Sequence, residues 1–577
     1  MALKKQVDIL PIKNTKRNTL KWLWHVTGNY KGGVAALFAV QVTFGLCGVA
    51  SAMLFRALID CAVGGQQTGF FLMALLLAGL FLGEDLLGVF NRFLYEWTRA
   101  SLENRLKGRL FSCLLHKDYA AVTAVHSGEW VSRLTSDTVV VAGGIMDILP
   151  SLGGMLARLI GALAALFILE PAFFYILIPA GLLMILVTAS LRKILKRLHK
   201  QIQEANGEVL SFLQERLGSL MILRVFSVEK QAEKDAAQRM NKHKAARIRR
   251  NHFSNLCNFG FNLIVDCGYL LGAVYCGYGI LQGTISYGTF TAILQLIGQV
   301  QSPFASITGV IPQYFAMTAS AERLIEAEIY PDDGNKKMVS EQKIHQFYQE
   351  EFKSIGVRDA SFSYRTNEQQ ENERLTVLEN VNLEIQKGEY VAFTGHSGCG
   401  KSTLLKLLMS LYPLDSGERY IRAAKAGQAV EYPLTAAWRG LFAYVPQGNQ
   451  LMSGTIREVV AFGDPDAMQQ EGRLAQALKI ACADEFVMTL EHGVDTRLGE
   501  RGAGLSEGQM QRISIARAIF SDRPILILDE ATSSLDEATE QQLLTNLRQM
   551  TDKTVLIITH RPAALQICDR KIEMAEH

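Results

Sequence analysis

The chain has 577 residues, which is too long for one ordinary globular domain. Hydrophobic residues make up 49% of it, the formal net charge is only +3, and basic residues gather at the ends of apolar stretches, so the sequence does not indicate a nucleic-acid-binding protein. None of the nine cysteines forms a C-x-x-C pair, which argues against a disulfide framework and against a zinc site.

Six membrane-spanning helices are predicted from long apolar stretches in the N-terminal part of the chain, because about 18 apolar residues suffice to cross a bilayer. Arg158 interrupts the third stretch, and the last stretch is long enough for two helices that separate near 283–288. The stretches cover 32–55, 64–83, 149–169, 171–191 and 267–321. The first stretch is longer than the core of a signal peptide and follows a basic segment, so we expect a retained helix.

The orientation of these spans is predicted from the segments between them. Lys and Arg are frequent between the second and third spans and between the fourth and fifth, but absent from the short connections. The positive-inside rule therefore places both termini and both long segments in the cytoplasm of a multi-pass protein of the cell membrane. These segments are poor in Gly and Pro, so we expect the helices to continue past the lipid bilayer and to turn or dock near 127–134 and 217–220. A pair of solvated loops is the alternative.

Five charged residues lie within or near the predicted spans. They are Glu84, Asp85, Asp147, Arg158 and Asp266. A charge inside a membrane is a candidate for a functional site, and the four acids would suit a cationic cargo. In the alternative interpretation, Arg158 pairs with one acid and the remaining acids face cytoplasmic water, so the role of these residues stays open.

A phosphate-binding loop of the pattern G-x-x-x-x-G-K-[ST] occupies 395–402. The apolar residues 390–394 predict a buried strand before it and 403–408 predict a helix after it, which is the context that this motif requires. Its glycines let backbone N–H groups converge on phosphate oxygens, and the lysine reaches the terminal phosphates. The predicted ATP-binding residues here are Gly395, Ser397, Gly398, Cys399, Gly400, Lys401, Ser402 and Thr403.

An acidic pair, Asp529 and Glu530, follows the apolar run 525–528. The hydroxyl of Ser402 and the carboxylate of Asp529 are suitable ligands for Mg²⁺, and Glu530 is placed to polarise an attacking water. The sequence therefore predicts ATP and Mg²⁺ as cofactors and Glu530 as a catalytic residue.

Between the phosphate loop and the acidic pair lies a third motif, LSEGQ at 505–509. The ordered set resembles the ATP-binding-cassette (ABC) exporter half-transporters, in which six membrane helices are followed by one nucleotide-binding domain. The resemblance implies an all-α polytopic membrane domain whose six long helices extend into the cytoplasm, followed by an α/β P-loop NTPase domain of ABC type. We assign the membrane domain to 1–327, a linker to 328–352 and the nucleotide-binding domain to 353–577.

The resemblance also implies roles for residues outside the phosphate loop. Tyr364 would stack on the adenine ring, and His560 would contact the γ-phosphate. Gln447 would sense Mg²⁺ as one of its ligands and would also contact the membrane half. His560 and Gln447 therefore join Glu530 as predicted catalytic residues.

Further implied contacts reach a second subunit. Ser506, Gly508 and Gln509 belong to the signature motif, which caps ATP bound to the other subunit. Asp536 would cross the dimer interface, and Glu500 would lie on the segment that meets the partner's loops.

Three features depart from the family pattern. Glu507 stands where the family usually has Gly, and we expect this variant to be tolerated. The segment 421–433 fits the family poorly, and the sequence offers no account of it. The chain also stops at His577, soon after His560, where the family usually continues with another strand and helices.

The resemblance implies an ATP hydrolase coupled to transport, which works as a dimer by alternating access. We favour a homodimer because the predicted catalytic residues are all present, and a heterodimer with another half-transporter stays open. The predicted function is export of a small molecule, lipid or peptide from the cytoplasm or the inner leaflet, with an unknown cargo and no nucleic-acid partner. The alternatives are an importer of a metal chelate with the same architecture and a transport-inactive membrane protein regulated by ATP. The intact acidic pair argues against the last of these.

Overall fold

The computed structural model describes residues 15–125, 127–334, 338–365, 374–425, 427–448, 451–499, 502 and 504–574. Contacts divide the chain into two compact units. The first unit comprises 1–111 and 128–328, and the second comprises 112–127 and 329–577. A short piece of the first long loop therefore belongs to the same unit as the C-terminal part of the chain.

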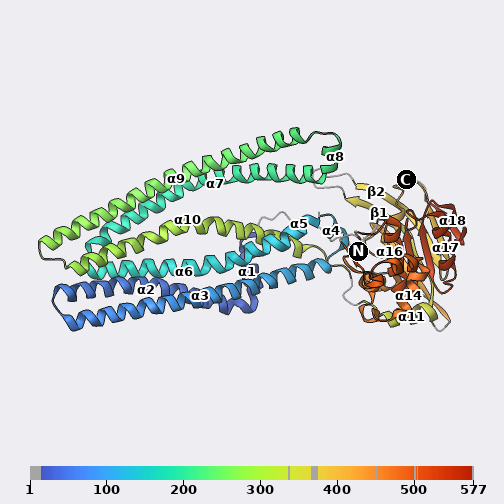
Figure 1. Ribbon diagram of the computed structural model, residues 1–577, viewed down its shortest axis with the longest axis horizontal. Helices are drawn as coiled ribbons and strands as arrows, with labels where there is room; N and C mark the ends of the chain where they lie inside the picture. The colour runs from blue at the N-terminus through green and yellow to red at the C-terminus, as the bar shows by residue number, and fades with distance from the viewer. Residues whose placement is uncertain are drawn as a thin grey trace. The chain divides into compact units, whose positions relative to one another are not determined.

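Every regular element in the described part of the first unit is a helix (Figure 1). Its elements are α1 (Thr15–Thr27), η1 (Gly28–Tyr30), α2 (Lys31–Val63), α3 (Gln67–Leu115), α5 (Ser127–Ser132), the π-helix η2 (Arg133–Asp137), α6 (Thr138–Leu169), α7 (Ala172–Gly218), α8 (Leu220–Val225), α9 (Glu229–Leu281) and α10 (Tyr287–Ile329). Figure 1 shows α7 and α9 as a long antiparallel hairpin that is closed by α8.

The long charged segments between the predicted spans are helical, so the prediction of extended helices is confirmed and the solvated loops are not found there. Helix α3 has 49 residues, which corresponds to about 74 Å at a rise of 1.5 Å per residue. The hydrocarbon core of a bilayer is only about 30 Å thick, so most of such a helix must lie outside it. Within the described residues, four helical stretches are long and apolar enough to cross a membrane: Thr19–Val63, Gln67–Leu115, Ser127–Leu169 and Glu229–Leu281.

Small residues bring α2 and α6 into close contact. An added Cβ on Gly45 of α2 would come within 2.7 Å of the Gly154 carbonyl oxygen of α6. Farther along the same contact, Ala52 and Ala162 are fully buried. Without a hydrophobic driving force inside lipid, close approach of backbones at small residues is a main source of helix association.

The five charged residues of the predicted spans differ in their hydrogen-bond partners and in their exposure. Arg158 donates a hydrogen bond to Ser302 Oγ at 3.3 Å, so its described partner is a hydroxyl group and not one of the acids. Asp147 accepts a hydrogen bond from the Tyr95 hydroxyl at 2.7 Å. The other three acids, Glu84, Asp85 and Asp266, are half-buried or exposed in the single chain.

The second unit is built on two main sheets. The antiparallel sheet has the order β2-β1-β4-β5, the parallel sheet has the order β11-β3-β10-β9-β6, and β7 pairs with β8 in a two-stranded ribbon. The strands are β1 (Phe352–Arg365), β2 (Arg374–Gln386), β3 (Tyr390–Thr394), β4 (Ser416–Lys425), β5 (Gln428–Pro433), β6 (Phe442–Val445), β7 (Gly454–Thr455), β8 (Arg497–Leu498), β9 (Ile525–Asp529), β10 (Thr554–Ile558) and β11 (Arg570–Glu573).

Helices cover these sheets. They are α4 (Tyr119–Thr123), α11 (Glu341–Glu350), α12 (Lys401–Leu408), η3 (Ala436–Leu441), α13 (Ile456–Val460), η4 (Ala461–Gly463), η5 (Pro465–Ala467), α14 (Glu471–Ile480), α15 (Asp484–Thr489), η6 (Gly493–Asp495), α16 (Glu507–Phe520), α17 (Glu537–Arg548) and α18 (Pro562–Gln566). Every residue of β3, β9 and β10 is buried, as is typical of parallel strands that are covered on both faces.

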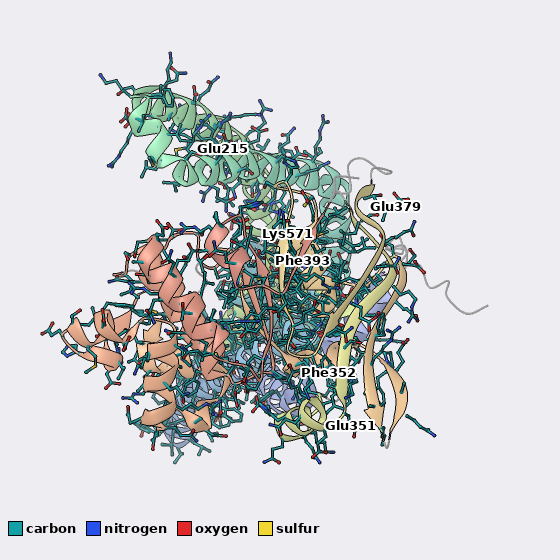
Figure 2. All side chains as sticks on the ribbon, turned by 90° about the vertical axis from the view of Figure 1, so that its right-hand side faces the viewer. Glu215, Glu351, Phe352, Glu379, Phe393 and Lys571 are labelled. Carbon is teal, nitrogen blue, oxygen red and sulfur yellow. The ribbon has the colours of Figure 1, made fainter. Side chains whose placement is uncertain are left out.

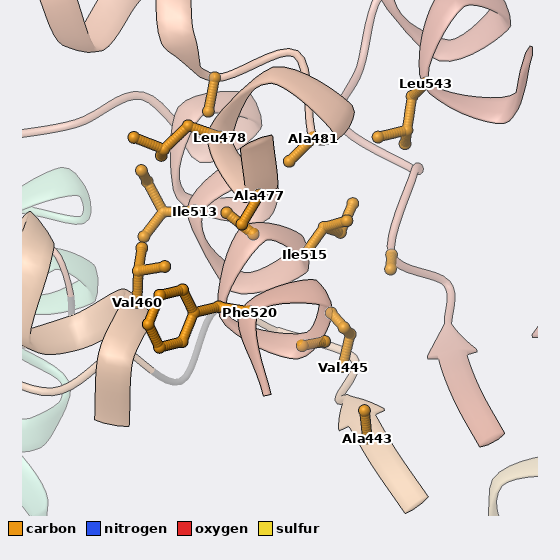
Figure 3. Close-up of a cluster of buried hydrophobic side chains, with 14 of the residues drawn as sticks. Ala443, Val445, Val460, Ala477, Leu478, Ala481, Ile513, Ile515, Phe520 and Leu543 are labelled. Carbon is orange, nitrogen blue, oxygen red and sulfur yellow. The ribbon is translucent and has the colours of Figure 1, made fainter. Parts of the chain in front are cut away.

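Two clusters of buried side chains fill the second unit. One lies between the parallel sheet and the helices α13, α14, α16 and α17, and Figure 3 shows Val445, Ile513 and Phe520 within it. The other joins the two sheets through α12 and includes Phe352 and Phe393, both labelled in Figure 2. The α/β architecture that the sequence predicts for this part of the chain is therefore confirmed.

The structure accounts for two features that departed from the family pattern. The unexplained segment 421–433 contains the end of β4 and all of β5, which add a hairpin to the antiparallel sheet. Glu431 of β5 pairs with Arg358 of β1 and with Arg422 of β4 on the exposed face of that sheet. Beyond His560, strand β11 pairs with β3 at the edge of the parallel sheet, so a further strand is present in the described residues.

Candidate nucleotide-binding site

The phosphate loop connects β3 to α12 and is open to a ligand on its outer side, where Ser397 and Gly398 are exposed. Gly400 caps α12 in the left-handed conformation, with φ of 91°, and an added Cβ would come within 2.8 Å of Leu378. The positively charged Lys401 Nζ lies inside the loop, where it donates hydrogen bonds to the carbonyl oxygens of Gly395 at 2.7 Å and His396 at 2.8 Å. A helix N-terminus with an ammonium group beside it is a strong site for phosphate.

The proposed metal ligands lie together behind this loop. Ser402 Oγ donates to Asp529 Oδ1 at 3.1 Å, and the Tyr444 hydroxyl donates to Asp529 Oδ2 at 3.0 Å. Burial raises the pKa of the Asp529 carboxyl, while these two hydrogen bonds oppose that rise. Burial and the adjacent carboxylate raise the pKa of Tyr444 as well, so this phenol stays a donor. A hydroxyl and a carboxylate are hard oxygen donors of the kind that Mg²⁺ prefers.

The register of the parallel sheet brings the candidate catalytic residues together at the carboxyl ends of its strands. Ile558 is opposite both Asp529 and Phe393, and Val445 is opposite Leu528. The residues that follow these strands therefore emerge together at the carboxyl end of the sheet, where ligands bind in open α/β folds. They are Gly395 after β3, Gln447 after β6, Glu530 after β9 and His560 after β10.

Gln447 and Glu530 are in direct contact. Gln447 Nε2 donates to Glu530 Oε2 at 2.7 Å, which orients the carboxylate beside Asp529. Glu530 has φ of 50°, in a backbone region that non-glycine residues rarely adopt and that is frequent at functional sites. His560 is exposed two residues beyond the end of β10.

Tyr364 lies at the end of β1, next to the helix that follows the phosphate loop. Its hydroxyl group and Thr403 Oγ1 are 3.1 Å apart, and its ring is in edge contact with Tyr412. Tyr364 is half-buried, so one part of the aromatic ring is available to a ligand.

The signature residues form a separate group. Ser506 caps α16, because its Oγ accepts from Gln509 N at 3.3 Å while Gln509 Oε1 accepts from Ser506 N at 2.9 Å. Gly508 lies against the carbonyl oxygen of Ser534, which an added Cβ would approach to 2.8 Å. Asp536 caps α17, and its hydrogen bonds from Thr539 lower the pKa of its carboxyl.

Exposure of this second group is consistent with contacts to another molecule. Ser506 and Asp536 are exposed in the single chain. Glu507 begins α16, where an acidic residue in the first turn interacts favourably with the helix dipole, so the departure from Gly has a local physical reason. Glu500, which was expected on the segment that meets the partner, lies outside the described residues.

Sequence reasoning missed two polar contacts of this site. Besides Tyr444, it missed Arg561, which donates to the Leu535 carbonyl oxygen at 2.9 Å and to the buried Glu540 at 2.8 Å. Arg561 thereby fixes the segment after Glu530 to the end of β10. In the sequence, Tyr444 is only a hydroxyl-bearing residue in an otherwise apolar strand, and Arg561 is only an arginine next to His560. Neither residue belongs to a motif.

Comparison with known proteins identifies both units. Residues 34–304 match the family described as ABC transporter transmembrane region, and 378–533 match the family described as ABC transporter. The ATP-dependent lipid A-core flippase of Pectobacterium atrosepticum is 27% identical over 556 residues, which cover 96% of this chain and 92% of the flippase. The uncharacterized ABC transporter ATP-binding protein YfiC of Bacillus subtilis is 27% identical, with 97% of this chain and 90% of that protein covered.

The fold is also shared with a solved structure. The structure of a bacterial Atm1-family ABC exporter with ATP bound superposes with a TM-score of 0.78. The similarity covers 95% of this chain and 94% of the exporter at 21% sequence identity.

Proposed function

Because the chain belongs to the ABC exporter half-transporters, which join one transmembrane region to one ATP-hydrolysing domain, we propose that two copies form a homodimeric exporter. The dimer would work by alternating access, with both termini and both long loops in the cytoplasm. We further propose a lipid or a similar amphiphile as cargo. Relatives that match nearly the whole chain and are named lipid A-core flippases support this class of cargo.

The contact between Gln447 and Glu530 carries the proposal of active hydrolysis. It places a carboxylate beside Asp529, at the sheet edge to which the phosphate loop also belongs. In the proposed cycle, Lys401 and the N-terminus of α12 bind the phosphates of ATP, and Ser402 and Asp529 hold Mg²⁺. Glu530 orients and polarises the attacking water, and His560 contacts the γ-phosphate. A membrane protein that used ATP only as a regulatory ligand would not need this arrangement.

The separation of the two groups of site residues supports a dimer. Within the phosphate loop Lys401 contacts Gly395, and Ser402 of the loop contacts Asp529. Ser506 contacts Gln509 instead, and Gly508 lies against Ser534. The capped N-terminus of α16 carries a partial positive charge and exposes Ser506, which suits the phosphates of an ATP molecule on the second copy. Two copies would then complete two equivalent ATP sites.

An exposed apolar surface on α8 gives a second reason for a partner. Its side chains are 45% to 79% exposed, and burying one of this size typically contributes about 1.5–3 kcal/mol. The α8 cap comprises Leu220, Met221, Ile222, Val225 and Phe226. We propose that this cap docks on the ATP-binding unit of the second copy.

A matching groove of about 250 Å³ exists in the second unit. Met452, Val459 and Phe462 supply its apolar side chains, and Phe462 and Met452 are exposed. Glu458 and Arg517 lie beside them, so the groove offers an apolar floor with charged flanks, like the centre and rim of a protein interface.

The test is ATP hydrolysis by the chain alone in lipid nanodiscs. Wild-type protein should hydrolyse ATP, and Glu530→Gln should lower the rate on the order of 100-fold, because a positioned general base contributes about that much. Glu485→Gln, at an exposed position of α15, is the matched control and should leave the rate unchanged. An inactive wild type that still binds ATP would reject the homodimer, and an equal rate in Glu530→Gln would reject the catalytic assignment.

The cargo class can be tested with the same preparation. Stimulation of wild-type hydrolysis by lipid-like amphiphiles, but not by metal chelates or soluble peptides, is the expected result. Stimulation by a chelate alone would favour the importer instead.

A further inference from the structure

The turn of the first loop is joined to the ATP-binding unit by backbone hydrogen bonds. Asp118 N donates to the Pro331 carbonyl oxygen and Asp333 N donates to the His116 carbonyl oxygen, both at 2.9 Å. Lys117 Nζ also donates to Asp332 at 2.8 Å. These contacts lie within the second unit and hold α4 at a defined place on it.

A second set of contacts ties this turn to the end of α12. Arg439 forms a bidentate ion pair with Asp333. It also donates hydrogen bonds to the carbonyl oxygens of Met409 and Ser410. Since α12 begins at the phosphate loop, the turn of the first loop and the nucleotide site share one rigid helix of eight residues.

Three tyrosines continue this link to the nucleotide base. Tyr119, the first residue of α4, meets Tyr412 with ring centroids 5.7 Å apart and an interplanar angle of 76°. Tyr412 in turn meets Tyr364 at 5.8 Å and 85°. Both contacts have the edge-to-face geometry that aromatic pairs prefer, and each ring therefore restricts the orientation of the next.

Tyr412 is the middle member of this row. Burial raises the pKa of its hydroxyl to about 12. The ring of Tyr412 thus contacts both Tyr119 of α4 and Tyr364. None of the sequence motifs includes Tyr412 or Tyr119.

We propose that Tyr412 is a positioning residue that links the nucleotide base to α4, an inference that rests on the proposed function because it requires a base stacked on Tyr364. Stacking of the base fixes the ring of Tyr364, the edge contact fixes Tyr412, and Tyr412 holds Tyr119 and α4 in place. Because α4 follows α3 after three residues, ordering of α4 acts directly on the helix that carries the second predicted span.

Hydrogen–deuterium exchange gives a direct readout of α4. The amides of Ala121, Val122 and Ala124 are hydrogen bonded to Asp118 and Ala120, so their exchange reports the opening of this helix. Full-length protein in nanodiscs is measured with and without saturating AMP-PNP and Mg²⁺. In wild-type protein the nucleotide should slow exchange at these amides by about fivefold, the lower end of typical coupling between two sites, and should also protect α12.

Three variants separate the link from simple packing. Tyr412→Leu removes the aromatic ring and should abolish the nucleotide-dependent protection of α4 while α12 stays protected. Tyr412→Phe keeps the ring and should behave as wild type. Tyr432→Leu is the matched control, because Tyr432 is a half-buried aromatic residue of the same unit that contacts Phe347 and Trp438.

Each outcome decides between the interpretations. Continued protection of α4 in Tyr412→Leu, or loss of protection in Tyr412→Phe, overturns the ring-to-ring link. Wild-type protein in which α12 is protected and α4 is not also overturns it, but leaves the proposed function intact. If AMP-PNP protects neither α12 nor α4 in wild-type protein, the proposed function fails and the link fails with it.

Discussion

The short helices α4 and α8 occupy equivalent places in the two long loops but differ in their surroundings. Helix α4 is tied to the ATP-binding unit of its own chain through Asp118, Tyr119 and the neighbouring backbone. Helix α8 buries only Leu223 and leaves its other apolar side chains exposed. The first loop is thus anchored within its own chain, and we propose that the second loop completes its contacts in a dimer.

Among the variants that test this comparison of α4 with α8, the largest effect is expected from a charge in the α8 cap. Phe226→Asp should lower ATP hydrolysis at least tenfold, because an unpaired carboxylate at a buried interface costs more than the roughly 1.4 kcal/mol that corresponds to a factor of ten. The rate in nanodiscs and the dimer fraction by native mass spectrometry are measured together.

A control for this variant is available on the neighbouring helix. Gln238→Asp introduces the same charge at an exposed position of α9 and should leave both quantities unchanged. If Phe226→Asp hydrolyses ATP as fast as Gln238→Asp, the α8 cap has no partner in the working dimer.

A smaller effect is expected at the link between the first loop and α12. Arg439→Ala removes the pair with Asp333 and leaves the carbonyl oxygens of Met409 and Ser410 without this donor, so the ATP-binding unit should lose about 1–3 kcal/mol in its free energy of unfolding. Denaturant unfolding followed by fluorescence measures the loss. Arg439→Lys keeps the charge but lacks the planar guanidinium group, so it should recover only part of the lost free energy of unfolding. Full recovery would show that the geometry of the guanidinium group is unimportant.

The smallest effect is expected at the N-terminus of α4. Asp118→Ala removes the side chain that accepts a hydrogen bond from Ala121 N, and loss of such a cap costs about 1 kcal/mol. Exchange of the α4 amides should therefore rise by roughly fivefold at 25 °C. Asp118→Asn retains an accepting oxygen and should exchange nearly as wild type, and equal exchange in both variants would contradict a capping role.

The phosphate loop and the α4 contacts show what could be predicted from the sequence. The buried strand, the glycine-rich loop and the helix at 390–408 are adjacent in the chain, and each has a composition that favours its local structure. Tyr119 and Tyr412 are almost three hundred positions apart, and nothing in their local sequence indicates that they meet. The same is true of Arg439 and Asp333, which are separated by 106 positions.

The segment 421–433 was unpredictable for a related reason. Its charged residues are typical of a solvated surface. Glu431 becomes a partner of both Arg358 and Arg422 only because β4 pairs with β1 and β5 pairs with β4. Strand pairing depends on partners elsewhere in the chain, so an edge hairpin of mixed polarity carries a weak sequence signal.

The sequence by itself determined the class of the protein: apolar stretches long enough for a membrane, and ordered motifs whose charges and glycines suit ATP. The tertiary structure decided how these parts meet. The register of the parallel sheet brought Gln447, Glu530 and His560 to the carboxyl end of the sheet. Folding placed Tyr119 of α4 against Tyr412, which also contacts Tyr364, while it left α8 exposed. The reason is physical: hydrophobic length and loop chemistry act locally along the chain, whereas packing and hydrogen bonding between distant residues exist only once the chain has folded.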